Sequence, residues 1–111
     1  MTEEIIDKGK PLAVVSYLTI IGIIVAYFMN KDKDNNPFTN FHLRQSLGIW
    51  LTFHALGIVV STLDYSIVRL VFYFCIGVIL IFGFINAVIG KAQEVPLVGK
   101  FYQRIFASLG N

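Results

Sequence analysis

The sequence predicts an all-α membrane protein with three transmembrane helices and a carboxyl-terminal amphipathic helix. Of its 111 residues, 56% are hydrophobic and only 14% are charged, against about 25% in a typical soluble domain. The charges are also unevenly placed, because residues 11–30, 45–63 and 70–90 carry none. Each window has about the 20 apolar residues that a helix needs to cross a bilayer. These observations exclude an ordinary soluble domain, a disordered chain and a disulfide scaffold.

The length predicts a single polytopic domain over residues 1–111. We expect the first span at about residues 11–29, because Pro11 suits the first turn of a helix. The amino end is acidic, and the bulky residues 26–29 do not form a cleavage site for a signal peptidase. The first window is therefore predicted to be a retained span.

The second and third windows predict a helical hairpin. Asn36 and Pro37 are typical of a helix start, with Asn36 as the cap and Pro37 at the first helical position. The span proper is expected at about residues 45–63, and a tight link leads into a third span at about 67–90. Gly90 is expected to end that helix.

The last segment predicts an amphipathic helix in the membrane interface. Its apolar residues recur at helical spacing, while Lys100 and Arg104 fall on the other face, where they would point at lipid phosphates. The apolar residues are Leu97, Val98, Phe101, Tyr102, Ile105, Phe106 and Leu109.

The basic residues predict an orientation in the bacterial inner membrane. With three spans, one side holds six Lys and Arg residues and the other holds Lys8, Lys10 and Arg69. The positive-inside rule then puts the 31–45 loop and the carboxyl tail in the cytoplasm and the amino terminus outside. Anionic headgroups are the expected partners of these residues. The basic clusters are too sparse for nucleic-acid binding.

His54 is the midpoint of the second window, and Thr19 lies at a similar depth in the first. A polar group at the bilayer centre needs a partner or a cavity. One interpretation is a pH-responsive or substrate-lining site at His54. The other is a neutral histidine that bonds between helices, for example to Thr19.

Asn86 lies one turn inside the cytoplasmic end of the third span. We expect it at the depth of four polar residues that end the first span or begin the second: Tyr27, Asn30, Arg44 and Gln45. Such a cluster forms either a network that locks the helices together or the mouth of a groove. Each span also has two small residues four apart, which favours close helix packing or self-association.

No set of residues predicts catalysis, a cofactor or a metal site. The apolar windows contain no acidic pair, and the chain has no Gly-rich phosphate loop. His42 and His54 are 12 residues apart, roughly 18 Å along a helix, which is too far to share a metal ion. We therefore expect a protein that is not an enzyme.

Two segments resemble a known family. They are Asn36–Leu47, with the core Phe-His-Leu-Arg-Gln, and Val95–Tyr102, with Pro-Leu-Val-Gly-Lys-Phe-Tyr. Both resemble a family of small prokaryotic membrane proteins that is similar to the import component of the chloroplast inner-envelope (Tic) translocon. The resemblance covers about residues 10–106 and implies that His42, Arg44 and Gln45 are the signature positions.

Two functional hypotheses follow. The first is an import-component-like or accessory subunit of a larger membrane complex. It would dock partners or headgroups through His42, Arg44, Gln45, Lys100 and Arg104. The second is a homo-oligomeric pore or solute-handling protein with His54 and Asn86 along its path.

Overall fold

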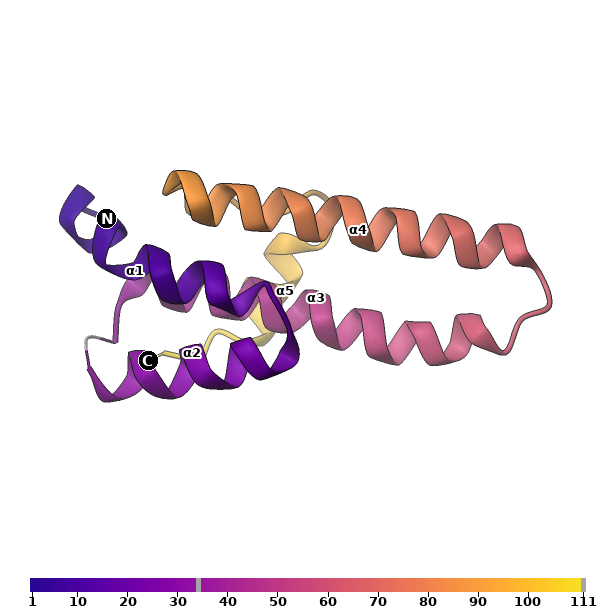
Figure 1. Cartoon of the computed structure of the whole chain (residues 1–111), viewed down its shortest axis with the longest axis horizontal. Helices are drawn as coiled ribbons and strands as arrows, with labels where there is room; N and C mark the ends of the chain where they lie inside the picture. Colours follow the sequence, from indigo (N-terminus) through magenta and orange to yellow (C-terminus); the bar gives the residue numbers. More distant parts are fainter. Residues whose placement is uncertain (34, 111) are drawn as a thin grey trace.

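The computed structural model describes residues 1–33 and 35–110, so residue 34 of the predicted 31–45 loop lies outside the described residues. The described chain is all-helical, with five helices and no strand. In Figure 1, the shorter helices lie beside one half of the long ones. The five are α1 (Glu3–Ser16), α2 (Ile20–Asp32), α3 (Pro37–Ser61), α4 (Ser66–Ile89) and α5 (Gly99–Ile105).

The helices α3 and α4 form the predicted hairpin and are the two described helices long and apolar enough to cross a membrane. Asn36 caps α3 by accepting hydrogen bonds from the backbone N–H groups of Phe38 and Thr39. Gly90 ends α4 in the left-handed conformation, with φ 83°. Only 6% of the apolar window of α4 is buried within the chain, so α4 is not the core helix of a soluble fold.

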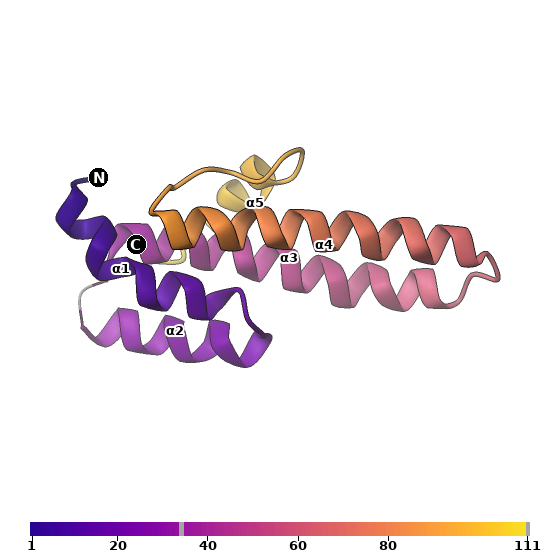
Figure 2. The same cartoon turned by 45° about the horizontal axis from the view of Figure 1, so that its top comes forward.

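The prediction that residues 11–29 form a first membrane span is wrong, and the described chain has two candidate spans. The chain reverses between Ser16 and Ile20, and α2 returns beside α1 as a short antiparallel hairpin, as Figures 1 and 2 both show. Thr19 allows the reversal, because its hydroxyl accepts a hydrogen bond from the backbone N–H of Gly22 and starts a new helix. An absence of charge marks an apolar segment but does not show where it turns.

The α1–α2 hairpin packs on the amino-terminal half of α3 and the carboxyl-terminal half of α4. Glycines allow close approaches both inside the hairpin and against the long helices. A Cβ at Gly22 in α2 would meet the carbonyl oxygen of Val15 in α1. A Cβ at Gly83 in α4 would lie 2.6 Å from Cε1 of Tyr17. The close helix packing predicted for these small residues therefore occurs between helices of one chain.

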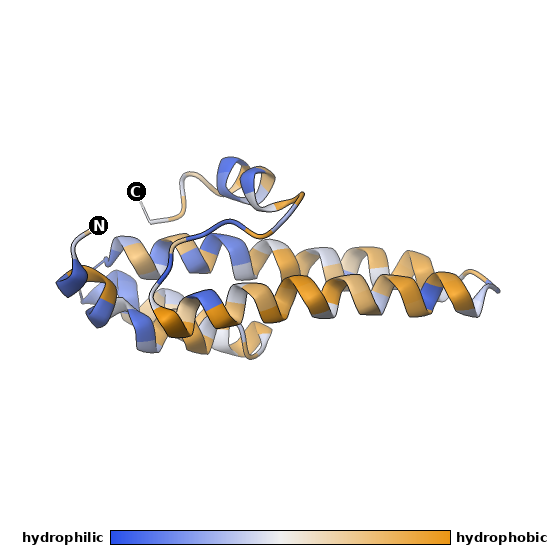
Figure 3. Ribbon diagram, turned by 90° about the horizontal axis from the view of Figure 1, so that it is seen from above, coloured by the Kyte–Doolittle hydropathy of each residue, from blue (hydrophilic) through white to orange (hydrophobic). Residues whose placement is uncertain are grey.

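The carboxyl-terminal segment folds back along the same half of the molecule. Figure 3 shows a largely hydrophilic connection between α4 and α5 lying over the long helices. The helix α5 is only seven residues long and packs on α3, where the buried ring of Tyr102 covers Gly48. Its hydroxyl pairs with that of Thr52, at 2.6 Å. The predicted amphipathic helix is therefore shorter than expected and rests on the protein's own α3.

The predicted placement of the amino terminus opposite the 31–45 loop is also wrong. The side-chain amide of Asn36 donates to the carbonyl of Ile5 at 2.8 Å, and the hydroxyl of Thr39 donates to the carbonyl of Gly9 at 3.0 Å. These bonds hold the first half of α1 against the start of α3. Because α1 and α2 together return to the end where they began, both lie at one end of the α3–α4 hairpin (Figure 2).

Substituting Gly83 by Ala should destabilise this packing, because the new methyl group would collide with the ring of Tyr17. We expect a loss of about 1–3 kcal/mol, as for overpacking elsewhere, measured by thermal denaturation in detergent. Gly77→Ala is the matched control on α4, where a Cβ would meet nothing within 4 Å. Equal melting of the two variants would contradict the packing of Tyr17 against α4.

Candidate functional site

The candidate functional site is a buried polar cluster, the polar hub, formed by Tyr17, His42 and Gln45. Tyr17 follows α1 at the tip of the hairpin, and the other two lie one turn apart on α3. The hydroxyl of Tyr17 lies 2.6 Å from Nδ1 of His42 and 2.9 Å from Nε2 of Gln45. Tyr17 is only 2% exposed, and both α3 side chains are fully buried.

The partners of His42 assign its tautomer. Its Nε2 lies 2.9 Å from the carbonyl oxygen of Lys91, which can only accept, so Nε2 carries a proton. In the neutral ring Nδ1 is then the acceptor, and the Tyr17 hydroxyl donates to it. The Tyr17 oxygen in turn accepts from the amide of Gln45. Each hydrogen bond fixes which atom donates in the next, and the whole chain of bonds is satisfied by a neutral histidine.

Gln45 connects the hub to the segment after α4. Its side-chain carbonyl accepts from the backbone N–H of Val95 at 2.8 Å, and its amide lies 3.4 Å from the carbonyl of Gln93. Burial raises the pKa of the Tyr17 hydroxyl, while the hydrogen bond from Gln45 acts in the opposite direction. Tyr17 therefore stays neutral and available as a donor. The hub joins the tip of the α1–α2 hairpin, α3 and the chain that follows α4.

A second polar layer, made of three asparagines, lies nearer the end of the molecule. Asn30 at the end of α2 donates to the side chain of Asn40 at 2.8 Å, and its side-chain carbonyl accepts from the backbone N–H of Asn36 at 2.8 Å. All three are buried to at least 95%. This layer fixes the return of α2 against the start of α3.

Arg44 and Gln103 hold the carboxyl tail. The guanidinium of Arg44 donates through Nε and Nη2 to the carbonyl of Leu109, at 3.1 and 2.8 Å. The amide of Gln103 donates to the carbonyl of Phe41 at 2.9 Å. Burial raises the pKa of Tyr102, the α5 residue that covers α3, and the hydrogen bond with Thr52 opposes that shift.

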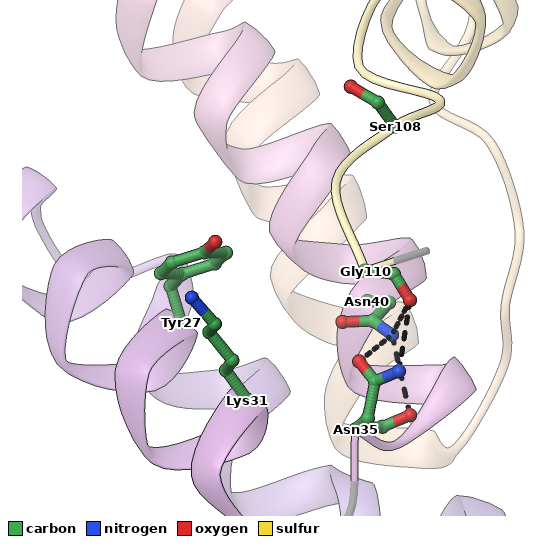
Figure 4. Close-up of a pocket in the computed structure, with 6 residues that line it drawn as sticks. All are labelled: Tyr27, Lys31, Asn35, Asn40, Ser108 and Gly110. Carbon is green, nitrogen blue, oxygen red and sulfur yellow. Dashed lines mark hydrogen bonds between the residues drawn. The ribbon is translucent and has the colours of Figure 1, made fainter.

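A pocket of about 290 Å³ opens beside the asparagine layer, between α2 and the tail (Figure 4). Its wall on α2 includes Lys31, whose Nζ lies 5.9 Å from the ring centre of Tyr27. Across the pocket, the amides of Asn35 and Asn40 both donate to the carbonyl of Gly110. These amides are used within the chain, so the pocket wall is mainly a structural contact.

The structure divides the predicted docking residues into two groups. His42 and Gln45 are buried in the hub, and the half-buried Arg44 is engaged with Leu109, so their polar groups serve the fold. Lys100 and Arg104 are exposed on α5. A docking role for these two basic residues stays a prediction.

The predicted intramembrane residues do not meet. Thr19 caps α2, whereas His54 is exposed on α3, where its ring lies 5.2 Å from that of Phe53 and 6.2 Å from that of Trp50. Asn86 is buried and donates to the carbonyl of Phe82 one turn back, at 2.9 Å. The expected cluster around Asn86 is instead split between the hub, the asparagine layer and the tail.

Tyr17 and Asn40 are the residues that the sequence interpretation missed. Tyr17 lies inside the first charge-free window, and only the reversal of the chain brings it to His42. Asn40 carried one usable signal, because it lies one helical turn after the Asn36 cap. Within residues 1–33 and 35–110, no group of three His, Cys, Asp or Glu side chains comes together to hold a metal ion.

Residues 9–102 match the model of the magnetosome magnetite crystal formation protein family. Comparisons with curated proteins and with solved structures find no similar protein. The resemblance to the family related to the Tic import component is therefore wrong. The residues that suggested it lie within the matched range, where His42 and Gln45 form the hub.

Replacing Tyr17 by Phe tests the hub, because it removes one hydroxyl and leaves Nδ1 of His42 and the amide of Gln45 without that partner. We expect a loss of about 1–3 kcal/mol in unfolding free energy, measured by denaturation in detergent. Tyr65→Phe is the matched control, since Tyr65 is 67% exposed. Indistinguishable unfolding of the two variants would contradict the hub.

Proposed function

The chain belongs to the magnetosome magnetite crystal formation protein family, and from that premise we propose that it contributes to magnetite crystal formation as a non-enzymatic protein of the magnetosome membrane. The observation that carries the proposal is the match over residues 9–102, which includes the hub and both long helices. The chemistry of the hub supports a role without catalysis, because its groups bond one another and the backbone.

The chain would then act through contacts made inside the membrane. Of the three pairs of small residues, Gly22 with Ala26 and Gly83 with Ala87 are buried within the chain. Gly57 and Ser61 lie on the uncovered half of α3, and Ser61 is exposed. A Cβ at Gly57 would lie 3.9 Å from Cε2 of Phe72, so Gly57 faces α4 and only Ser61 of the six small residues is exposed. The small-residue pattern therefore gives self-association little support.

The pore hypothesis gains less support. His54 faces outward from α3, while Asn86 is buried against its own helix. The two side chains therefore do not line one path within a single copy.

The positions of the charges support one orientation. The half of the molecule with the termini holds eight basic residues, namely Lys8, Lys10, Lys31, Lys33, Arg44, Lys91, Lys100 and Arg104. Arg69 alone lies toward the other end, beside the turn between α3 and α4. By the positive-inside rule, we propose that the termini and the 31–45 loop face the cytoplasm and that the turn faces the other side.

The function is tested by expressing the chain in a magnetite-forming bacterium from which the resident members of this family have been deleted. We expect the chain to restore the size distribution of the crystals seen by electron microscopy. Tyr17→Phe should restore it less well than Tyr65→Phe, because only Tyr17 holds the hub. Crystals that stay altered despite normal amounts of the chain would contradict the proposal.

The orientation is tested with single cysteines in a Cys75→Ser background. In spheroplasts, an impermeant maleimide should label Asp64→Cys in the turn and spare Lys8→Cys and Lys100→Cys until the membrane is opened. All three positions are exposed in the folded chain, so differences in labelling report the side of the membrane. Labelling of Lys8→Cys in closed spheroplasts would refute a cytoplasmic amino terminus.

A further inference from the structure

We infer that the protein is a wedge in the bilayer, with a larger cross-section in the leaflet that holds its termini, and that it therefore prefers curved membrane with those termini on the convex side. The partner is a lipid surface of defined curvature. The inference rests on the membrane crossing by α3 and α4 in the proposed function.

Helix lengths separate the segments that cross from those that do not. The 25 residues of α3 and the 24 of α4 span about 37 and 36 Å at 1.5 Å per residue, enough for a hydrocarbon core of about 30 Å. The 13 residues of α2 span only about 20 Å. Its apolar part, residues 20–29, covers about 15 Å and so reaches only about halfway.

The outer face of α2 indicates that this hairpin enters the lipid. Ile21 is 72% exposed, Ile24 51%, Val25 44% and Phe28 55%, and their spacing puts them on one stripe of the helix. The stripe ends at the polar residues Asn30–Asp32. We infer that lipid covers this apolar stripe, because the stripe continues into the exposed apolar surface of α3 and α4.

The tip of the hairpin can lie in the membrane, because its polar side chains are paired. The backbone N–H of Leu18 donates to the carbonyl of Val15 at 3.1 Å, and Thr19 caps α2. The hydroxyl of Ser16 donates to the carbonyl of Ala13 at 2.7 Å, and Tyr17 bonds in the hub. Non-helical backbone at membrane depth is tolerated where its groups find such partners.

The helix α5 adds to the same leaflet. It exposes the apolar residues Phe101 and Ile105 as well as the basic residues Lys100 and Arg104. A helix with this mixture suits lipid, with its long basic side chains extended toward the phosphates. In Figure 1, α5 lies level with the tip of the α1–α2 hairpin.

Of the helices in residues 1–33 and 35–110, only α3 and α4 extend into the opposite leaflet. Ile58 is 70% exposed, Ile67 64%, Leu70 67% and Phe74 71%, and neither α1, α2 nor α5 reaches this part (Figures 1 and 2). Two helices lie in one leaflet and at least four in the other. Because each helix is about 10 Å across, the protein's cross-sectional area is roughly twofold larger in the leaflet with the termini. A membrane that curves with the wide end on its convex side relieves this mismatch. Amphipathic helices bind membranes in a similarly curvature-sensitive way.

Membrane tethers pulled from giant vesicles test the inference directly. The full chain is reconstituted in equal parts of phosphatidylcholine and phosphatidylglycerol, with Cys75→Ser and one new cysteine. An impermeant fluorescent maleimide then marks only the molecules whose cysteine faces outward. Ser108→Cys reports molecules with the tail outside, and Asp64→Cys reports the opposite orientation, so each is the other's control.

We expect the Ser108→Cys population to be enriched in the tether relative to the flat membrane, with a sorting ratio above one. The Asp64→Cys population should be depleted, with a ratio below one, because its wide end lies in the concave leaflet. Equal densities of both would overturn the wedge, as expected if a second copy covered the uncovered half. Enrichment of both populations in the tether, or depletion of both, would also overturn the wedge. Lys100→Cys is a second tail probe with the same expectation should Ser108→Cys alter melting.

Discussion

The bond between the Tyr17 hydroxyl and Nδ1 of His42 is the interaction on which the rest of the structure depends. It fixes the tip of a hairpin that would otherwise be one more apolar segment free to extend. It also sets the direction of every neighbouring bond, from Gln45 through Tyr17 to His42 and on to the carbonyl of Lys91. One phenol therefore joins the amino-terminal hairpin, α3 and the chain after α4.

The asymmetry of the molecule follows from that constraint. With the tip held at α3, neither α1 nor α2 can cover the far half of the long hairpin, so one end is a packed bundle and the other is two apolar helices (Figure 3). The same folding back collects eight of the nine basic residues in one half. Shape and charge thus agree on one orientation, and this asymmetry suits a role in shaping or organising a membrane.

Much of the fold was predictable from local signals. The Asn36 cap, the Gly90 stop and the hairpin of two apolar windows each depend on neighbouring residues, and all three predictions are confirmed. The reversal at residues 17–19 was not predictable, because charge-free windows look the same whether a helix crosses or turns back. The resemblance was misleading for a related reason: His42 and Gln45 are distinctive residues, but their partners lie 25 or more positions away.

The distance between residues 10 and 91 tests the central claim, which is that the first apolar segment folds back and does not cross. Lys10 lies against Gly90, where a Cβ would come within 3.3 Å of the Lys10 Nζ. Spin labels at Lys10→Cys and Lys91→Cys, in Cys75→Ser protein in lipid nanodiscs, should therefore give a short distance by pulsed electron paramagnetic resonance. A crossing first helix would place the labels on opposite sides of a hydrocarbon core of about 30 Å. A distance of that size or more would contradict the account.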